Sequence, residues 1–149
     1  MSAMTDGEIR ELCTTFFDAY QDRRVDILDR VLADDCIIWH NVFGRETTKA
    51  DNLSKFHDSY QGQRRRTYDD RTINTFDDGF MIQYSLNGVM NNGHRGSLWI
   101  CIVARVRDGQ ITRIDEYMDS SKFATWAGAP DAAAEAAATI GPKGSGGDR

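Results

Sequence analysis

The last predicted strand carries a carboxylate between two apolar side chains. Because side chains alternate across a strand, Ile114, Glu116 and Met118 share one face, and Asp115 and Tyr117 share the other. Burial beside apolar groups raises the pKa of a carboxyl, since desolvation disfavours the charged form. Such a carboxyl can act as an acid or a base near neutral pH. The alternative is that strand twist leaves Glu116 solvated or paired with an arginine.

An early strand offers a partner for that carboxyl. His40 alternates with Cys36 and Ile38, so it projects to the same side as apolar residues. A neutral imidazole there can abstract a C–H or O–H proton, and an imidazole facing a carboxylate can pass one proton without a cofactor. A core histidine that binds a backbone carbonyl fits the same pattern. Tyr20 can stabilise a developing oxyanion through its hydroxyl, or simply pack in the core. We predict His40, Glu116 and Tyr20 as catalytic residues, with no cofactor.

The bulk composition limits the partners of the chain. Its 149 residues suit one domain with a sizeable core, and a net charge of −5 argues against broad contact with nucleic acid. The only basic run, residues 64–66, is either a solvated loop or a contact for an anion or carboxylate. The three histidines include no pair at ligand spacing, so no metal site is predicted.

The cysteines and the N-terminus indicate a location. Cys13, Cys36 and Cys101 are odd in number and lie in apolar stretches, which is typical of reduced, buried thiols. The first ten residues lack the basic and apolar regions of a signal peptide, and no apolar stretch is long enough to span a membrane. We expect a cytoplasmic protein without membrane contact.

The first part of the chain predicts helices around one strand. A capping box formed by Thr5 and Glu8 begins an amphipathic helix over residues 6–22, and a shorter helix follows it. A strand is predicted at residues 36–40, and a third helix over residues 47–60. The apolar stripe of that third helix contains Leu53, Phe56, His57 and Tyr60.

The second part predicts an antiparallel meander. Asn-Gly and Asp-Gly turns, which favour tight hairpins, separate its strands. The predicted strands lie near residues 67–76, 80–90, 95–107 and 110–119, followed by a short helix at residues 120–126. We expect one domain over residues 1–129 and a flexible Ala/Gly-rich tail over residues 130–149.

Helices followed by a run of strands predict an α+β fold. A long sheet must curl, and helices on its concave side close it into a cone-shaped α+β barrel with a hollow centre. Inward-facing residues would line a pocket for a small hydrophobic molecule. The predicted substrate-binding residues are Phe16, Ile38, Phe56, His57, Tyr60, Gln83, Ser85, Leu98, Ile100, Ile114, Met118, Phe123 and Trp126.

Over residues 6–127 this order of elements resembles the nuclear transport factor 2-like superfamily, and within it the SnoaL-like group. The resemblance rests on Ala33-Asp34-Asp35 before the first strand and on two stretches near the end, Gly109 to Thr112 and Glu116 to Asp119. It implies that His40 stands where ketosteroid isomerase has its proton-transferring Asp and limonene-epoxide hydrolase a water-holding Asn. Glu116 falls where the hydrolase and polyketide cyclases carry a working Asp.

Other positions depart from those relatives. Phe16 stands at the isomerase's oxyanion-hole Tyr, and about Ile102 at its protonated Asp. The hydrolase's Arg and second Asp map to about Gln83 and Ser85, which can hydrogen-bond ligand oxygens or face solvent or a partner chain. The chain therefore keeps the pocket of these relatives and changes the catalytic set.

Together these features predict a cofactor-independent acid–base enzyme. We expect a lyase, isomerase or dehydratase rather than a hydrolase, acting on a bulky aromatic, polyketide or terpenoid-like molecule. The alternative is a non-catalytic module that binds a hydrophobic ligand or serves assembly. A homodimer is expected through the outer sheet face, which would carry Asp115, Tyr117, Trp99, Cys101 and Val103.

Overall fold

The computed structural model describes residues 2–126, without the side chains of residues 59, 124 and 125. Three helices, a single turn of 3-10 helix (η1) and six strands make up this part of the chain, with a fourth helix at its end. The elements are α1 (Asp6–Gln21), α2 (Val25–Val31), β1 (Leu32–His40), β2 (Arg45–Thr48), α3 (Lys49–Ser54), η1 (Asp58–Tyr60), β3 (Gln63–Phe76), β4 (Gly79–Met90), β5 (Arg95–Arg107), β6 (Gln110–Met118) and α4 (Ser120–Trp126).

Helix α1 begins as its capping box predicts. The Thr5 hydroxyl accepts from the backbone N–H of Glu8 at 3.2 Å, and the Glu8 carboxylate accepts from the backbone N–H of Thr5 at 2.7 Å. The reciprocal bonds satisfy donors that a helix start otherwise leaves unpaired. The helix buries one stripe, which includes Ile9, Leu12, Cys13, Phe16 and Phe17, against the sheet.

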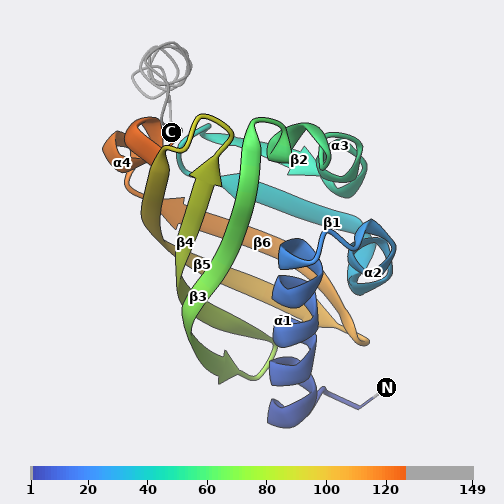
Figure 1. The fold of residues 1–149 in the computed structure, drawn as a ribbon. Helices are drawn as coiled ribbons and strands as arrows, with labels where there is room; N and C mark the ends of the chain where they lie inside the picture. Colours follow the sequence, from blue (N-terminus) through green and yellow to red (C-terminus); the bar gives the residue numbers. More distant parts are fainter. Residues whose placement is uncertain (1, 127–149) are drawn as a thin grey trace.

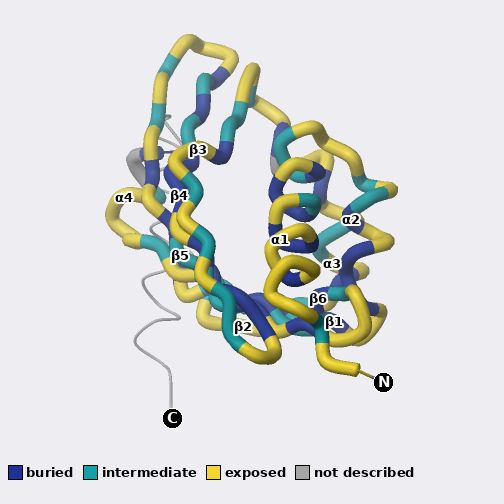
Figure 2. Tube along the Cα trace, turned by 90° about the horizontal axis from the view of Figure 1, so that it is seen from below, coloured by how far each residue is buried: buried dark blue, intermediate teal, exposed yellow. Residues whose placement is uncertain are grey.

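The six strands form one curved sheet in the order β2-β1-β6-β5-β4-β3. All neighbours are antiparallel except β1 and β6, which run parallel. The sheet is not closed, since β2 and β3 stand at its two ends. Figure 1 shows α1 crossing the concave side of the sheet, with α2 beside it and α3 farther along, next to β2, and Figure 2 shows buried positions alternating with exposed ones along the strands. The expected cone-shaped α+β fold is confirmed.

The predicted third helix over residues 47–60 is wrong in extent. Residues 45–48 instead form β2, which pairs with β1, and α3 covers only Lys49–Ser54 before η1. Thr48 ends the strand and caps α3, because its hydroxyl accepts from the backbone N–H of Asp51 at 3.2 Å. Although α3 ends at Ser54, Phe56 and Tyr60 of the predicted apolar stripe are still buried.

The four meander strands are confirmed at or near their predicted bounds. The last hairpin turns at Asp108 and Gly109, whose φ angles of 52° and 78° lie in the left-handed region that tight turns require. Strand β3 begins at Gln63, four residues earlier than predicted, so the basic run 64–66 belongs to a strand rather than to a loop.

Helix α4 packs closely on the sheet. A Cβ atom added to Gly96 would lie 2.7 Å from the backbone oxygen of Trp126, so only glycine allows this approach. Trp126 is buried at the end of the described chain. The predicted domain boundary at 129 and the tail over residues 130–149 lie outside the described residues.

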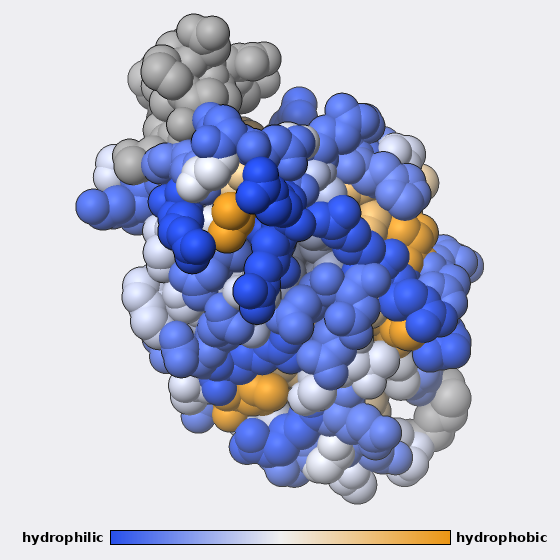
Figure 3. All heavy atoms as spheres, viewed as in Figure 1, coloured by the Kyte–Doolittle hydropathy of each residue, from blue (hydrophilic) through white to orange (hydrophobic). Residues whose placement is uncertain are grey.

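The face that carries α1 and β3 is mostly hydrophilic, with apolar residues in small separate patches (Figure 3). Among residues 2–126, no helix has the length and apolar character needed to cross a membrane.

Candidate active site

A cavity of about 630 Å³ lies between the concave side of the sheet and the helices. Its wall is mainly aromatic and aliphatic, with a few polar side chains, which is the usual composition of a small-molecule site. The lining residues are Phe16, Phe17, Tyr20, Ile38, His40, Phe43, Arg45, Thr47, Asp51, Asn52, Lys55, Phe56, Asp58, Gln63, Arg66, Tyr68, Tyr84, Leu86, Leu98, Ile100, Ile102, Ile114, Glu116, Met118, Phe123 and Trp126.

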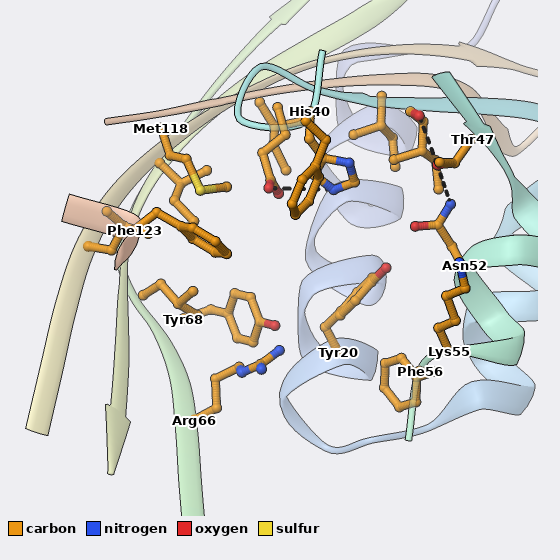
Figure 4. A pocket seen from close by; sticks show the side chains of 18 of the residues that line it. Tyr20, His40, Thr47, Asn52, Lys55, Phe56, Arg66, Tyr68, Met118 and Phe123 are labelled. Carbon is orange, nitrogen blue, oxygen red and sulfur yellow. Dashed lines mark hydrogen bonds and ion pairs between the residues drawn. The ribbon is translucent and has the colours of Figure 1, made fainter. Parts of the chain in front are cut away.

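His40 and Glu116 meet in this cavity. They are direct cross-strand partners in the parallel pair β1–β6, and both project inward. The Nε2 atom of His40 lies 3.6 Å from Oε1 of Glu116, with side chains that are 21% and 16% exposed (Figure 4). That separation is slightly long for a hydrogen bond.

Asn41 fixes the ends of these two strands. Its side-chain amide donates to the backbone oxygen of Met118 at 2.9 Å, and its amide oxygen accepts from the backbone N–H of Met118 at 3.0 Å. Its own backbone N–H donates to the backbone oxygen of Glu116 at 3.0 Å. Asn41 thus extends the ladder by one rung, directly beside the His40–Glu116 pair.

The environment of Glu116 suits proton transfer. Burial raises the pKa of this carboxyl, and the raise is opposed by the charges of His40 and Arg66 and by a hydrogen bond with Tyr84. A carboxyl whose pKa moves toward neutrality can hold a proton and return it, as general acid–base chemistry requires.

Tyr20 provides a neutral hydroxyl in the same space. Its ring packs between Phe16 and Phe56, with centroid distances of 4.9 Å and 5.5 Å, and the side chain lines the cavity. Burial, with a smaller contribution from Glu116, raises the pKa of Tyr20, so the phenol keeps its proton. A neutral phenol in an apolar cavity is a suitable donor to a developing oxyanion.

Most of the predicted substrate-binding residues line the cavity, but four do not. The residues brought together are Phe16, Ile38, Phe56, Leu98, Ile100, Ile114, Met118, Phe123 and Trp126.

The expectation for the other four is corrected for this cavity. Gln83 and Ser85 alternate with the cavity-lining Tyr84, so they face the outer side of the sheet. There Ser85 contacts Ser97 and Asn87. His57 is exposed at the end of the shortened α3 segment, and Tyr60 is buried behind the wall, where its hydroxyl donates to the backbone oxygen of Tyr20.

Sequence reasoning did not assign several polar residues to the cavity lining. Arg45 and Thr47 come from the unpredicted strand β2, and Asn52 from α3, where its amide donates to the Thr47 hydroxyl at 2.8 Å. Arg66 comes from the start of β3. Alternation along residues 64–68 is the signal that places Arg66 beside Tyr68 on the inner face.

Thiol and metal chemistry receive little support in the described part of the chain. Burial raises the pKa of Cys13 to about 12 and that of Cys36 to about 11, so both thiols are protonated and weakly nucleophilic. Residues 2–126 contain no group of three or more His, Cys, Asp or Glu placed to hold a metal ion.

Solved structures with this fold are numerous. A protein assigned as a polyketide cyclase from Xanthomonas campestris pv. campestris is similar with a TM-score of 0.72 and 21% identity, over 80% of this chain and 96% of that one. An LEH-like epoxide hydrolase from M. tuberculosis has a TM-score of 0.63 and 22% identity, over 78% and 86% of the two chains. A protein with a ketosteroid isomerase-like fold from Catenulispora acidiphila has a TM-score of 0.70 and 16% identity, over 80% and 94%. At these identities the likeness defines the fold alone.

Together, the cone and its internal cavity define a protein of the nuclear transport factor 2-like class. The family model of the SnoaL-like domain matches residues 13–114, more than half of the sequence. The chain belongs to the SnoaL-like family. No curated protein matches its sequence.

Proposed function

We propose that this protein is a cofactor-independent acid–base enzyme, of the lyase or isomerase and dehydratase type, for a bulky and mostly apolar small molecule. The observation that carries the proposal is the His40–Glu116 pair, 3.6 Å apart inside an apolar cavity of about 630 Å³. The cavity is large enough for an aromatic, polyketide or terpenoid-like ligand. The polyketide cyclase assignment of one structural neighbour supports the same substrate class.

In the proposed reaction, the neutral imidazole of His40 takes a proton from a carbon next to a carbonyl group. The electron pair of that C–H bond moves into the carbonyl, and the resulting oxyanion accepts a hydrogen bond from the Tyr20 hydroxyl. Glu116 stabilises the imidazolium and can carry the proton onward. Return of the proton to another carbon gives isomerisation, and transfer to a departing oxygen gives elimination.

Proton exchange tests this proposal without knowledge of the natural substrate. 2-Acetonaphthone is a flat, apolar ketone with exchangeable C–H bonds, and solvent deuterium entering its methyl group can be followed by proton NMR in D2O. We expect the wild type to accelerate exchange and His40→Ala to reduce the enzymatic rate at least about a hundredfold, the scale of general acid–base contributions. Asn92→Ala, on an exposed turn that does not line the cavity, is the matched control. Equal rates in wild type and His40→Ala would remove His40 from the chemistry.

A non-catalytic ligand-binding module is the second candidate. It is favoured by the largely apolar wall, which would bind a hydrophobic compound without any reaction. Saturable binding of 2-acetonaphthone with no exchange above the uncatalysed rate would support this alternative.

We also propose that the protein forms a homodimer through the outer sheet face. Trp99 is 62% exposed and Tyr117 is 45% exposed on that face, and Trp39 packs against Tyr117 at 5.3 Å between ring centroids. Exposed aromatic residues of this kind are enriched in protein interfaces. Trp99→Glu should convert a dimer to a monomer in sedimentation velocity, whereas Arg107→Glu should not. A wild type that sediments as a monomer would contradict the dimer.

A further inference from the structure

Arg66 provides a positive charge inside the cavity, at a distance from the proton-transfer pair. Figure 4 shows His40 and Arg66 at opposite ends of the cavity, with the hydroxyl groups of Tyr20 and Tyr68 between them. Arg66 comes from β3, whereas His40 and Glu116 come from the neighbouring strands β1 and β6. One end of the site is therefore suited to proton transfer and the other end carries a fixed cation.

The guanidinium of Arg66 is held in place by its neighbours. Its Nε donates to the side-chain oxygen of Gln63 at 2.7 Å, and its central carbon lies 4.0 Å from the ring centroid of Tyr60 and 5.4 Å from that of Trp126. Stacking on aromatic rings and hydrogen bonding orient the planar group in advance, so less entropy is lost when a ligand binds.

The charge of Arg66 acts on the interior of the cavity. It lowers the pKa of the Tyr68 hydroxyl and of the Glu116 carboxyl, each against the raising effect of burial. Among the other lining carboxylates, Asp51 accepts from the backbone N–H of Thr48 and Asp58 accepts from the side chain of Gln61.

Aromatic rings surround this cation. The indole of Trp126 packs over Gly88 and Gly96 of the sheet and lines the cavity beside Arg66. A guanidinium stacked on aromatic rings in a mostly apolar wall favours a ligand that brings oxygen acceptors to this point.

We propose that Arg66 binds a carboxylate of the substrate, so that the ligand is a bulky, mostly apolar acid whose reactive carbon lies at His40. Guanidinium groups recognise carboxylates through paired, charge-assisted hydrogen bonds, which give both affinity and orientation. The inference deepens the proposed function and rests on it for the position of the reaction, but carboxylate binding by Arg66 can be measured separately.

A matched ligand pair tests the site. 2-Naphthoate and 2-naphthamide have the same shape and differ in charge, and their affinities can be measured by isothermal titration calorimetry at pH 7.5. We expect the wild type to bind 2-naphthoate at least about tenfold more tightly, and Arg66→Met to reduce this preference to less than about twofold with little change in 2-naphthamide affinity. Arg66→Lys keeps the charge but loses the planar fork, so it should keep an intermediate preference.

Two further variants serve as controls. Arg65→Met removes the same charge one residue away on the outer face, where Arg65 lines a separate shallow hollow, and should keep the full preference. Lys55→Met removes a cation from the cavity rim. The proposal is overturned if the wild type shows no preference for 2-naphthoate or binds neither probe. It is also overturned if Arg66→Met or a folded Arg66→Lys keeps the full preference, or if Lys55→Met is the variant that removes it.

The outcome separates the two proposals. In His40→Ala, the preference for 2-naphthoate should persist while deuterium exchange into 2-acetonaphthone is lost. A wild type that prefers 2-naphthoate through Arg66 but catalyses no exchange would refute the proposed reaction and leave the carboxylate site standing.

Discussion

Asp115 and Glu116 are adjacent carboxylates on opposite sides of one sheet. Asp115 lies on the outer face, where Arg113 donates to it at 2.9–3.1 Å and both side chains are partly exposed. Glu116 points into the cavity, where burial raises its pKa and the imidazole of His40 lies 3.6 Å away. The residue type is similar and the backbone is shared, so the side of the sheet decides which carboxyl can do chemistry.

The same contrast holds along β4. Phe80, Ile82 and Tyr84 are almost completely buried on the inner face, whereas Met81 and Gln83 lie on the outer face. Outer residues of the neighbouring strands form exposed ion pairs, such as Arg105 with Asp78 at 2.8 Å. The inner face thus supplies the core and the cavity, and the outer face is more polar and more exposed to solvent.

The largest stability contrast should come from neighbours on β4. Phe80→Ala removes a ring with 0% exposure and should lower the free energy of unfolding by about 3–5 kcal/mol. Met81→Ala on the other face should cost less than about 1 kcal/mol. Urea denaturation followed by circular dichroism measures both, and similar losses would mean that the two faces do not differ as described.

The adjacent carboxylates give the functional contrast. Glu116→Gln should reduce catalysed deuterium exchange about a hundredfold, because the amide of Gln cannot accept and release a proton near neutral pH. The affinity for 2-acetonaphthone should be unchanged. Asp115→Asn should remain within about twofold of the wild-type rate. If Asp115→Asn lowered the exchange rate more than Glu116→Gln, the outer carboxylate rather than the inner one would take part in the reaction.

The pH dependence of stability sharpens the same comparison. Since the folded-state pKa of Glu116 is raised from 4.5, its contribution is fully present below that value and is lost as pH rises through the raised pKa. Glu116→Gln has no such loss, so its free energy of unfolding relative to wild type should increase between about pH 4 and pH 7. Thermal melts across this range measure the trend, and a difference that stays flat or decreases would contradict the raised pKa.

The smallest effect should come from an outer ion pair. Arg107 and Asp35 lie 3.1 Å apart with more than half of each side chain exposed. Arg107→Gln should change the free energy of unfolding by less than about 1 kcal/mol, because solvent screens such pairs. The change should shrink further in high salt, and a loss as large as that of Phe80→Ala would show that this face contributes to the core.

Much of the fold was predictable because local signals agreed with tertiary packing. The capping box at Thr5, the Asp108-Gly109 turn and the alternation around Glu116 each specify local geometry that the sheet keeps. The extent of the helix predicted over residues 47–60 was wrong for a different reason. Apolar residues spaced three or four apart can be buried equally well by a short α3 followed by η1.

The site was predictable in part for related reasons. The inward positions of His40 and Glu116 follow from alternation, and the direct contact follows only from the parallel pairing of β1 with β6. Arg66 was not assigned to the pocket from the sequence, because the strand was predicted to begin near residue 67 and alternation was not applied to the run 64–66. Gln83 and Ser85 were expected in the pocket through their positions in relatives, although their alternation with Tyr84 favours the outer face.

The hydrogen bonds of Asn41 between β1 and β6 affect how proteins with this fold can differ from one another. The spacing between His40 and Glu116 is set by main-chain bonding and by the Asn41 amide, whereas β2, α3 and α4 are short elements that contribute other parts of the cavity wall. Sequence changes in those elements can therefore reshape the cavity wall without moving His40 and Glu116 relative to each other.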